Sequence, residues 1–355
     1  MSGDGSLKLT VLFGERARAD GGFLADALVG IFARHRLRTS LVLRGIEGFG
    51  AKHQLRTDRL LTLSEDLPML ALAVDRRAAI EAALADVRAL PTFSGLVTLE
   101  RALLLAGDEL GRPHGDAEAI LAGRTAKLTV YVGRQERAGG GPAHVAVVDL
   151  LHRRGIAGAT VLLGVDGTAG GERRRARFFA RNAAVPVMVV AVGDGDRLAG
   201  TLGELAALLP APLATLERVQ VCKRDGALIE RARALPGSDP SGLPLWQKLT
   251  VYGSERASHG GVPLHRALVG ELRRAGAPGA TAVRGVWGFH GDHAPHGDRL
   301  LQLRRHVPVV TTVVDRPQAI QRWFDVIDQV TAATGLVTSE MVPVLEDPAR
   351  APAPG

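Results

Sequence analysis

The sequence predicts an α+β fold that is built from three tandem copies of one βαββαβ module. The first observation behind this prediction is a repeat, because Lys8-Leu9-Thr10-Val11 returns at residues 127–130 and again at 248–251. A fixed period of this kind is typical of a repeat architecture. Three more landmarks keep the same register: the glycines Gly45, Gly164 and Gly285; the prolines Pro68, Pro186 and Pro308; and the Thr-x-Glu patterns at Thr98–Glu100, Thr215–Glu217 and Thr338–Glu340.

The second observation is the order of hydrophobic patterns within each copy. A β-rich strand at Lys8–Phe13 leads into a helix with apolar residues at helical spacing: Phe23, Leu24, Ala27, Leu28, Ile31 and Phe32, repeated in the third copy as Leu264, Ala267, Leu268 and Leu272. A second strand follows, at Ser40–Arg44, Ala159–Leu163 and Ala280–Arg284. After a Gly-rich loop comes a long strand, Arg59–Val74. Proline cannot donate to a strand ladder, so Pro68 predicts a bulge or a sheet edge there.

The second half of the module contains another helix and a last strand. Asp75 and Asp315 are expected to cap this helix, and the last strand is expected at Gly95–Glu100 with its equivalents. In the third copy the apolar stripe of the helix comprises Ile320, Trp323, Phe324 and Ile327. The complete order is the split βαβ, or ferredoxin-like, arrangement, with two helices on one face of an antiparallel sheet. Three modules in one chain can cover their bare sheet faces by packing around a pseudo-threefold axis.

The repeat divides the chain into three modules and two connections. We place the modules at residues 7–105, 127–221 and 247–346, and the linkers at 106–126 and 222–246. The linkers are long enough to reach from one module to the next. Long bare loops are unusual in compact proteins, so we expect the linkers to carry some structure.

Composition narrows the class of protein. Hydrophobic residues make up 46% and charged residues 23% of the 355 residues, which is typical of a globular chain. No apolar stretch is long enough for a membrane helix, the start lacks a signal-peptide pattern, and one cysteine, Cys222, allows no intrachain disulfide. A cytoplasmic protein without membrane insertion is therefore expected. The net charge is +7, but the arginines are dispersed and aromatic residues are only 4%, which argues against a nucleic-acid partner.

Several stretches resemble the PII-like family catalogued as domain of unknown function 190. They are residues 42–50 (VLRGIEGFG), 63–68 (LSEDLP) and 95–100 (GLVTLE), and in the third copy residues 280–289 and 335–338. The second copy is degenerate. It keeps residues 158–164 (GATVLLG), but it has Val165-Asp166-Gly167-Thr168 where a Gly-Phe pair is expected, and it lacks the SEDLP stretch.

The resemblance implies a function as well as a fold. Members of the family look like PII signalling proteins, which form trimers and bind nucleotides between subunits. This chain would then be a trimer fused end to end, a non-enzymatic sensor that binds a small anionic ligand, with a nucleotide as first candidate. Some members accompany fluoride-exporter genes. The alternative is therefore an interaction protein that docks to a membrane transporter or another protein partner without a small ligand.

The Gly-rich loop after the second strand is the first candidate ligand site. Its residues are Arg44, Gly45, Gly48, Phe49 and Gly50 in copy 1, and Arg284, Gly285, Gly288 and Phe289 in copy 3. Glycines let backbone amides approach an anion, and arginine adds a planar, charge-assisted fork. The alternative is that these glycines only form a bulge and a hairpin tip. The P-loop pattern is absent from the sequence.

Two other groups of polar residues are candidate sites. His290, His293 and His296, with Asp292 and Asp298, form a weak candidate for a metal site, and a solvated loop is the alternative. Two charged pairs, Glu15-Arg16 and Glu255-Arg256, follow the first strand of their copies and can anchor a cleft across modules or form a structural ion pair. No nucleophile elbow or HExxH pattern occurs. The sequence therefore predicts no enzyme activity and no cofactor.

Overall fold

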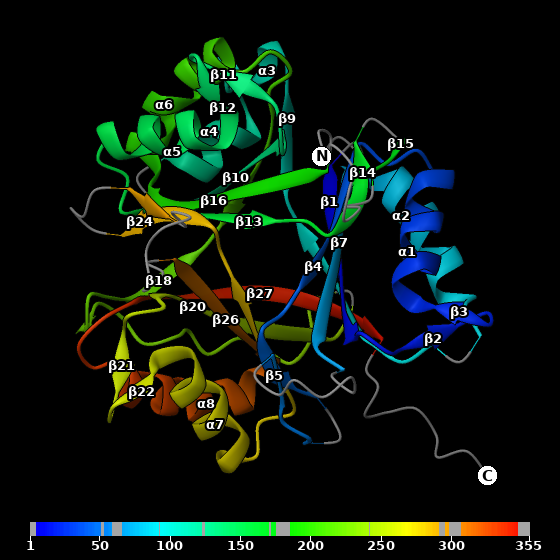
Figure 1. Ribbon diagram of the computed structural model, residues 1–355, viewed down its shortest axis with the longest axis vertical. Coiled ribbons are helices and arrows are strands. Elements are labelled where there is room, and N and C mark those ends of the chain that lie inside the picture. The colour runs from blue at the N-terminus through cyan, green and yellow to red at the C-terminus, as the bar shows by residue number, and fades with distance from the viewer. Residues whose placement is uncertain are drawn as a thin grey trace.

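The computed structural model describes residues 5–50, 53–58, 66–91, 93–122, 125–169, 172–174, 185–240, 242–290, 295–297 and 307–346. It is a mixed α+β structure with antiparallel sheets. Figure 1 shows three helix pairs on the outside of the molecule, α1 with α2, α5 with α6 and α7 with α8, while the sheets face inward. None of the helices in the described part of the chain has both the length and the apolar character that a membrane crossing requires.

Copy 1 forms a four-stranded core sheet in the order β4-β7-β1-β8, with every neighbouring pair antiparallel. Helices α1 and α2 pack on one face of it. The elements are β1 (Ser6–Gly14), β2 (Arg18–Ala19), β3 (Gly22–Phe23), α1 (Leu24–Arg34), β4 (Thr39–Arg44), β5 (Glu47–Phe49), β6 (Arg56–Thr57), β7 (Pro68–Arg76), α2 (Arg77–Arg88) and β8 (Leu96–Arg101).

Copies 2 and 3 repeat this order as β13-β16-β10-β17 and β23-β26-β20-β27. Copy 2 comprises β10 (Thr125–Gly133), β11 (Arg137–Ala138), β12 (Gly141–Pro142), α5 (Ala143–Arg153), β13 (Gly158–Leu163), β14 (Asp166–Ala169), β15 (Glu172–Arg173), β16 (Pro186–Asp194), α6 (Gly195–Leu208) and β17 (Leu213–Arg218). Copy 3 comprises β20 (Leu245–Ser254), β21 (Ser258–His259), β22 (Val262–Pro263), α7 (Leu264–Ala275), β23 (Ala280–Arg284), β24 (Trp287–His290), β25 (His296–Gly297), β26 (Pro308–Asp315), α8 (Pro317–Val330) and β27 (Leu336–Glu346).

The connections between copies carry regular structure, as the sequence indicated. The first contains α3 (Asp108–Gly111) and α4 (Asp116–Leu121), preceded by β9 (Leu103–Ala106), which begins within the module predicted at 7–105. The second contains β19 (Ala227–Leu228) and most of β18 (Gln220–Arg224), which begins within the module predicted at 127–221. In the second, Asp225 and Gly226 both have positive φ, which is the backbone of a tight hairpin turn.

Two local expectations were wrong. Pro68 opens β7, which pairs with β1 on one side and β4 on the other, so it marks neither a bulge nor an edge. The first position of a strand tolerates proline. Asp75 does not cap α2, because the N-cap is Arg76 and the Asp75 carboxylate accepts from the backbone N–H groups of Arg38 and Arg76. Asp315 likewise precedes the N-cap of α8, and its carboxylate accepts from the indole N–H of Trp323.

The second strand of every copy pairs with a short strand from another copy. β14 of copy 2 pairs with β4 of copy 1, β24 of copy 3 pairs with β13 of copy 2, and β5 of copy 1 pairs with β23 of copy 3. All three pairs are antiparallel and occupy equivalent positions in the repeat. The outer edge of each second strand is therefore covered, which removes an edge that would otherwise favour aggregation.

The fourth strand of every copy pairs with a segment from the other neighbouring copy, the one that its second strand does not contact. β9, which follows copy 1, pairs with β17; β18, which follows copy 2, pairs with β27; and the end of β27 pairs with β8. Each two copies therefore exchange segments reciprocally. We call these contacts seam 1–2, seam 2–3 and seam 3–1, after the copies that they join.

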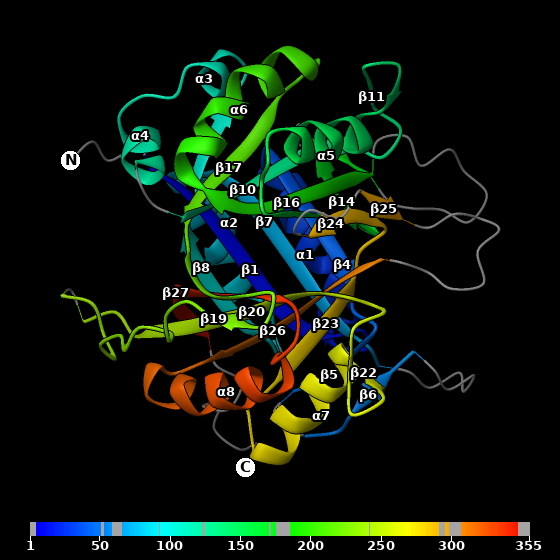
Figure 2. The same ribbon diagram turned by 90° about the vertical axis from the view of Figure 1, so that its left-hand side faces the viewer.

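Hydrophobic packing follows the same plan. Each helix pair and its sheet enclose one cluster of buried residues. A fourth cluster lies between the sheets, and every copy contributes to it: Leu41, Leu43, Leu72 and Val74 from copy 1; Tyr131, Leu162, Met188 and Val190 from copy 2; and Val283 and Val310 from copy 3. Figure 2 shows the three sheets around this shared interior.

Candidate functional site

The glycines that were candidates for ligand binding lie inside the seams. The N–H groups of Gly45 and Gly285 donate to the carbonyl oxygens of Pro68 and Pro308, each at 2.7 Å. A side chain at Gly48 would collide with the carbonyl oxygen of Ala280 in the next copy. Gly288 faces the backbone of copy 2 in the same manner, whereas Gly50 has open space around it. These glycines, apart from Gly50, let strands of two copies approach closely.

The aromatic residue of the same loop packs into a neighbouring copy. Phe49 stands opposite Ala280 and joins the core of copy 3, and Phe289 stands opposite Ala159 and joins the core of copy 2. Both phenylalanines are buried. In seam 1–2 the equivalent pair is polar, because Thr168 stands opposite Ser40 and their hydroxyl oxygens lie 2.8 Å apart. Two hydroxyl groups in seam 1–2 therefore take the place of the phenylalanine–alanine pairs of the other two seams.

The two candidate arginines pair with the carboxylates that follow the first strand. Arg44 donates from Nε and Nη2 to both oxygens of Glu15, at 2.8 and 3.0 Å. Arg284 donates to Glu255 at 2.8 Å, and its Nη1 lies 3.6 Å from a carboxylate oxygen of Asp58 in copy 1. The structure therefore places Arg284 between charged groups of two copies.

Further charged groups distinguish the seams. In seam 3–1, the buried Glu47 of copy 1 lies 3.5 Å from Nε of Arg266 in copy 3. In seam 1–2, Arg173 of copy 2 joins its own Asp166 to Asp26 of copy 1, with both contacts at 2.5 Å. The repeat position of Glu47 and Asp166 is Trp287 in copy 3, which packs on the core of copy 2. Since one position carries glutamate, aspartate or tryptophan, the seams have different chemistry.

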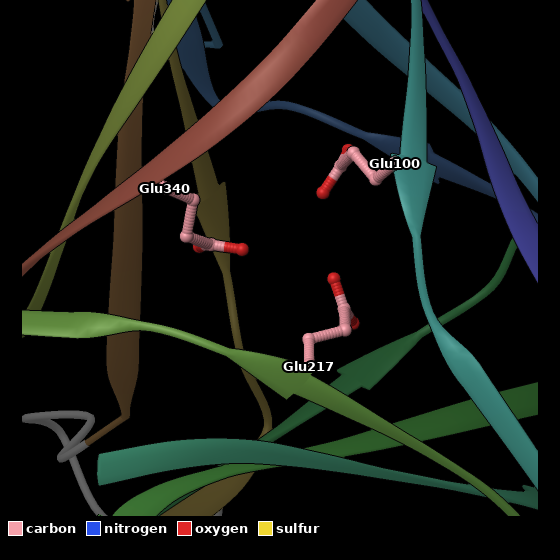
Figure 3. A group of neighbouring side chains, drawn as sticks. All are labelled: Glu100, Glu217 and Glu340. Carbon is pink, nitrogen blue, oxygen red and sulfur yellow. The ribbon is translucent and has the colours of Figure 1, made fainter. Parts of the chain in front are cut away.

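Three lysines and three glutamates form a buried ring where the copies meet. Each lysine is the first residue of a repeated Lys-Leu-Thr-Val, and each glutamate ends a Thr-x-Glu. Figure 3 shows the carboxylates of Glu100, Glu217 and Glu340 pointing toward one another from three different strands. All six side chains are at least 86% buried, the most exposed being Lys248 at 14%.

Each lysine of the ring bridges the glutamate of its own copy and that of the next. Lys8 lies 2.9 Å from Glu100 and also contacts Glu217. Lys127 lies 3.1 Å from Glu217 and contacts Glu340. Lys248 lies 3.4 Å from Glu340 and 2.6 Å from Glu100, which closes the ring. The charges balance, and each copy is joined to both of the others.

The charges of the ring favour the ionised forms of Glu100 and Lys8. Burial by itself would raise the pKa of Glu100, but the ammonium groups of Lys248 and Lys8 hold that pKa well below its usual value. Burial would lower the pKa of Lys8, and the carboxylates of Glu100 and Glu217 reverse this, so that the pKa lies above its usual value. Burial raises the pKa of the neighbouring Tyr131 hydroxyl to about 12.

The ring also has the geometry of a cation site, because one oxygen from each carboxylate lies within 4.8 Å of the others. The ammonium groups already neutralise these carboxylates, so a divalent ion would add uncompensated positive charge to a buried centre. The candidate histidine site is a separate matter. His293 lies outside the described residues, while β24 and β25 place the backbones of Gly288 and His296 opposite each other.

Seam 2–3 contains a pocket of about 500 Å³, counting space open to solvent. Its walls are mainly apolar and include Val192, Phe289 and Leu336. The exposed Arg224 and Asp225 of the β18–β19 hairpin also line it. The pocket thus combines residues of copies 2 and 3 with the linker between them.

Sequence reasoning missed the ring. Lys8, Lys127 and Lys248 and their three glutamates were noticed only as landmarks of the repeat. A buried charge has to be neutralised, so identical ionisable residues at alternating, strand-like positions in every copy are the signal that could have revealed it. The pairing of Arg44 with Glu15 and of Arg284 with Glu255 was not predicted either.

Comparison with known proteins agrees with the repeat. The family model for domain of unknown function 190, described as an uncharacterized ACR, matches residues 6–104, 125–221 and 246–344. A relative from Aquifex aeolicus (strain VF5), named a UPF0166 protein, is 31% identical over 97 residues, which is 27% of this chain and 90% of the relative. That relative therefore has about the length of one copy.

Proposed function

The chain belongs to the domain of unknown function 190 family through three tandem copies, and from that premise we propose that it is a PII-like signalling protein. It binds a small anionic ligand, with a nucleotide as our first candidate, in clefts between copies, and it regulates a protein partner. The proposal includes the architecture: three ferredoxin-like modules packed as an intrachain pseudo-trimer. The common strand order, the reciprocal exchange at the seams and the closed Lys–Glu ring support it.

One observation carries the ligand proposal. Arg284 of copy 3 lies between Glu255 of its own copy and Asp58 of copy 1, and its side chain is 29% exposed. A guanidinium fork suits phosphate and carboxylate groups because two parallel N–H bonds can form. An anion that binds Arg284 would displace these two carboxylates, which belong to different copies, so its binding can be sensed by both.

The first experiment is calorimetry of the full chain with ATP, ADP, AMP and cyclic nucleotides. We expect at least one to bind, and Arg284→Leu to weaken that binding by roughly tenfold to a hundredfold, the value of a charge-assisted hydrogen bond. Arg77→Leu is the matched control, since Arg77 belongs to an exposed pair with Glu81 on α2. Absence of heat with every nucleotide at sub-millimolar sensitivity would count against a nucleotide ligand.

A second candidate function is an interaction protein without a small ligand, docking to a membrane transporter such as a fluoride exporter. The packing of Gly45, Gly48, Gly285 and Gly288 in the seams favours it, because their role in strand contact already accounts for these glycines. Co-purification of a transport protein from native cells, together with silent calorimetry, would support this candidate over the sensor.

We also propose that the protein acts in the cytoplasm and is not an enzyme. The lysines and glutamates of the two repeated patterns form the Lys–Glu ring, where their charges neutralise each other between copies. A phosphate-release assay with ATP tests the second point. Turnover above that of a buffer control, lost together with binding in Arg284→Leu, would contradict it.

A further inference from the structure

We propose that the chain has two anion sites and not three, at Arg44 in seam 1–2 and at Arg284 in seam 3–1. At each site an internal carboxylate, Glu15 or Glu255, occupies the arginine until a ligand displaces it. Among the residues that the structure describes, seam 2–3 has no arginine–glutamate pair at the equivalent positions. This inference rests on the proposed ligand-binding function and adds the number of sites, their residues and the gating group.

Both arginine sites place an arginine against a glutamate at equivalent positions of the repeat. Arg44 holds both oxygens of Glu15 with two nitrogens, which is the bidentate arrangement that an incoming phosphate would adopt. Arg284 donates a single hydrogen bond from Nη2 to Glu255, and its Nη1 lies 3.6 Å from a carboxylate oxygen of Asp58 in copy 1. The side chains of Arg44 and Glu15 are 44% and 32% exposed, and those of Arg284 and Glu255 are 29% and 21% exposed. A solute can therefore reach them.

Copy 2 has lost both members of the pair. Leu163 replaces the arginine and packs against the core of copy 2, and Arg134 replaces the glutamate. With leucine at position 163, a glutamate at position 134 would have no arginine partner there, so the two differences fit each other. Seam 2–3 instead contains the mainly apolar pocket beside Phe289.

Neutralising a gating carboxylate is expected to raise the affinity for an anion, whereas removing an arginine is expected to lower it. Glu255→Gln keeps the shape of the side chain but removes the charge that competes with an anion for Arg284. The partly exposed pair contributes little in water, so the expected gain in affinity is modest, about threefold to tenfold. A purely structural ion pair would not give tighter binding when its carboxylate is neutralised.

Calorimetry with ATP and with inorganic pyrophosphate measures both the affinity and the number of sites in the full chain. We expect two sites in the wild type, one in Arg44→Leu, one in Arg284→Leu and none in the double variant. The double change Arg134→Glu with Leu163→Arg rebuilds the lost pair and is expected to give three sites. Thermal melting establishes that each variant is folded. Glu255→Gln provides an independent test if the rebuilt variant is unstable.

The outcomes separate this inference from the proposed function. A wild type that binds the probes at one or three sites, or whose affinity is unchanged in both single arginine variants, overturns the inference and leaves a ligand-binding protein. Weaker binding in Glu255→Gln overturns the gating role. A wild type that binds neither probe overturns the inference and removes support from the proposed function.

Discussion

Replacing Lys127 by methionine tests whether the buried ring holds the three copies together. Methionine keeps most of the aliphatic stem, so the change removes mainly the charge. Lys127 is only 6% exposed at its side chain, and it contacts Glu217 of its own copy and Glu340 of copy 3. Its loss leaves two ammonium groups to neutralise three buried carboxylates.

The expected cost is large because a buried carboxylate loses a partner. Breaking a buried ion pair by removing one member costs about 3–5 kcal/mol. The lower end, about 3 kcal/mol, applies here, since Glu217 keeps Lys8 and Glu340 keeps Lys248. The exposed control Arg77→Met is expected to cost less than about 1 kcal/mol.

Urea unfolding at pH 7 gives the free energy of unfolding of each variant from the midpoint and slope of the transition, and the differences between variants are these costs. The double variant Lys127→Met with Glu217→Gln restores charge balance, so it is expected to be more stable than Lys127→Met alone. The double-mutant cycle should give a coupling of at least about 1 kcal/mol. The reasoning is refuted if Lys127→Met lies within 1 kcal/mol of the wild type, or if the two changes simply add.

Three more predictions concern the same contacts. The pKa of Glu100 is depressed in the folded state. Its contribution to the stability of the protein is therefore complete above its unfolded pKa of about 4.3 and is lost as the pH falls below that value. If the melting temperatures of the wild type and Glu100→Gln fall in parallel as the pH is lowered, this prediction is wrong. Gly48→Ala should destabilise by about 1–3 kcal/mol through collision with Ala280, whereas Gly50→Ala should be nearly neutral in the same thermal melts. Phe49→Thr, which introduces the residue of copy 2, should cost about 3 kcal/mol in urea unfolding by emptying part of the core of copy 3; a cost below 1 kcal/mol would show that the seam tolerates either residue.

Much of the fold follows from periodicity along the chain. The opening strand was expected at Lys8–Phe13 and is observed at Ser6–Gly14, because alternating apolar residues signal a strand. Its polar positions Lys8 and Thr10 are also buried, which the alternation does not indicate. The third-copy helix stripe containing Trp323 and Phe324 is buried as expected. The cap at Asp75 failed because that carboxylate accepts from the backbone N–H of Arg38, just before β4, and such competition depends on contacts distant in sequence.

The candidate site depended more strongly on tertiary contacts. Glycine next to arginine indicates an anion cradle or a close backbone approach equally well, and only the register of Gly48 against Thr281 distinguishes the two. The pair Thr168–Ser40 is instructive in the same way. As an isolated residue, Thr168 looked like decay of the motif, whereas in the structure it is matched by a hydroxyl 128 positions away.

The sequence by itself determined that there are three copies, which elements each contains and which ionisable residues recur, since all of these are periodic properties of one chain. The tertiary structure alone decided that Lys8 meets Glu217, Lys127 meets Glu340 and Lys248 meets Glu100. The physical reason is that hydrophobic patterns fix which face of a strand is buried but not which neighbour buries it. Packing and charge neutralisation between distant segments make that choice.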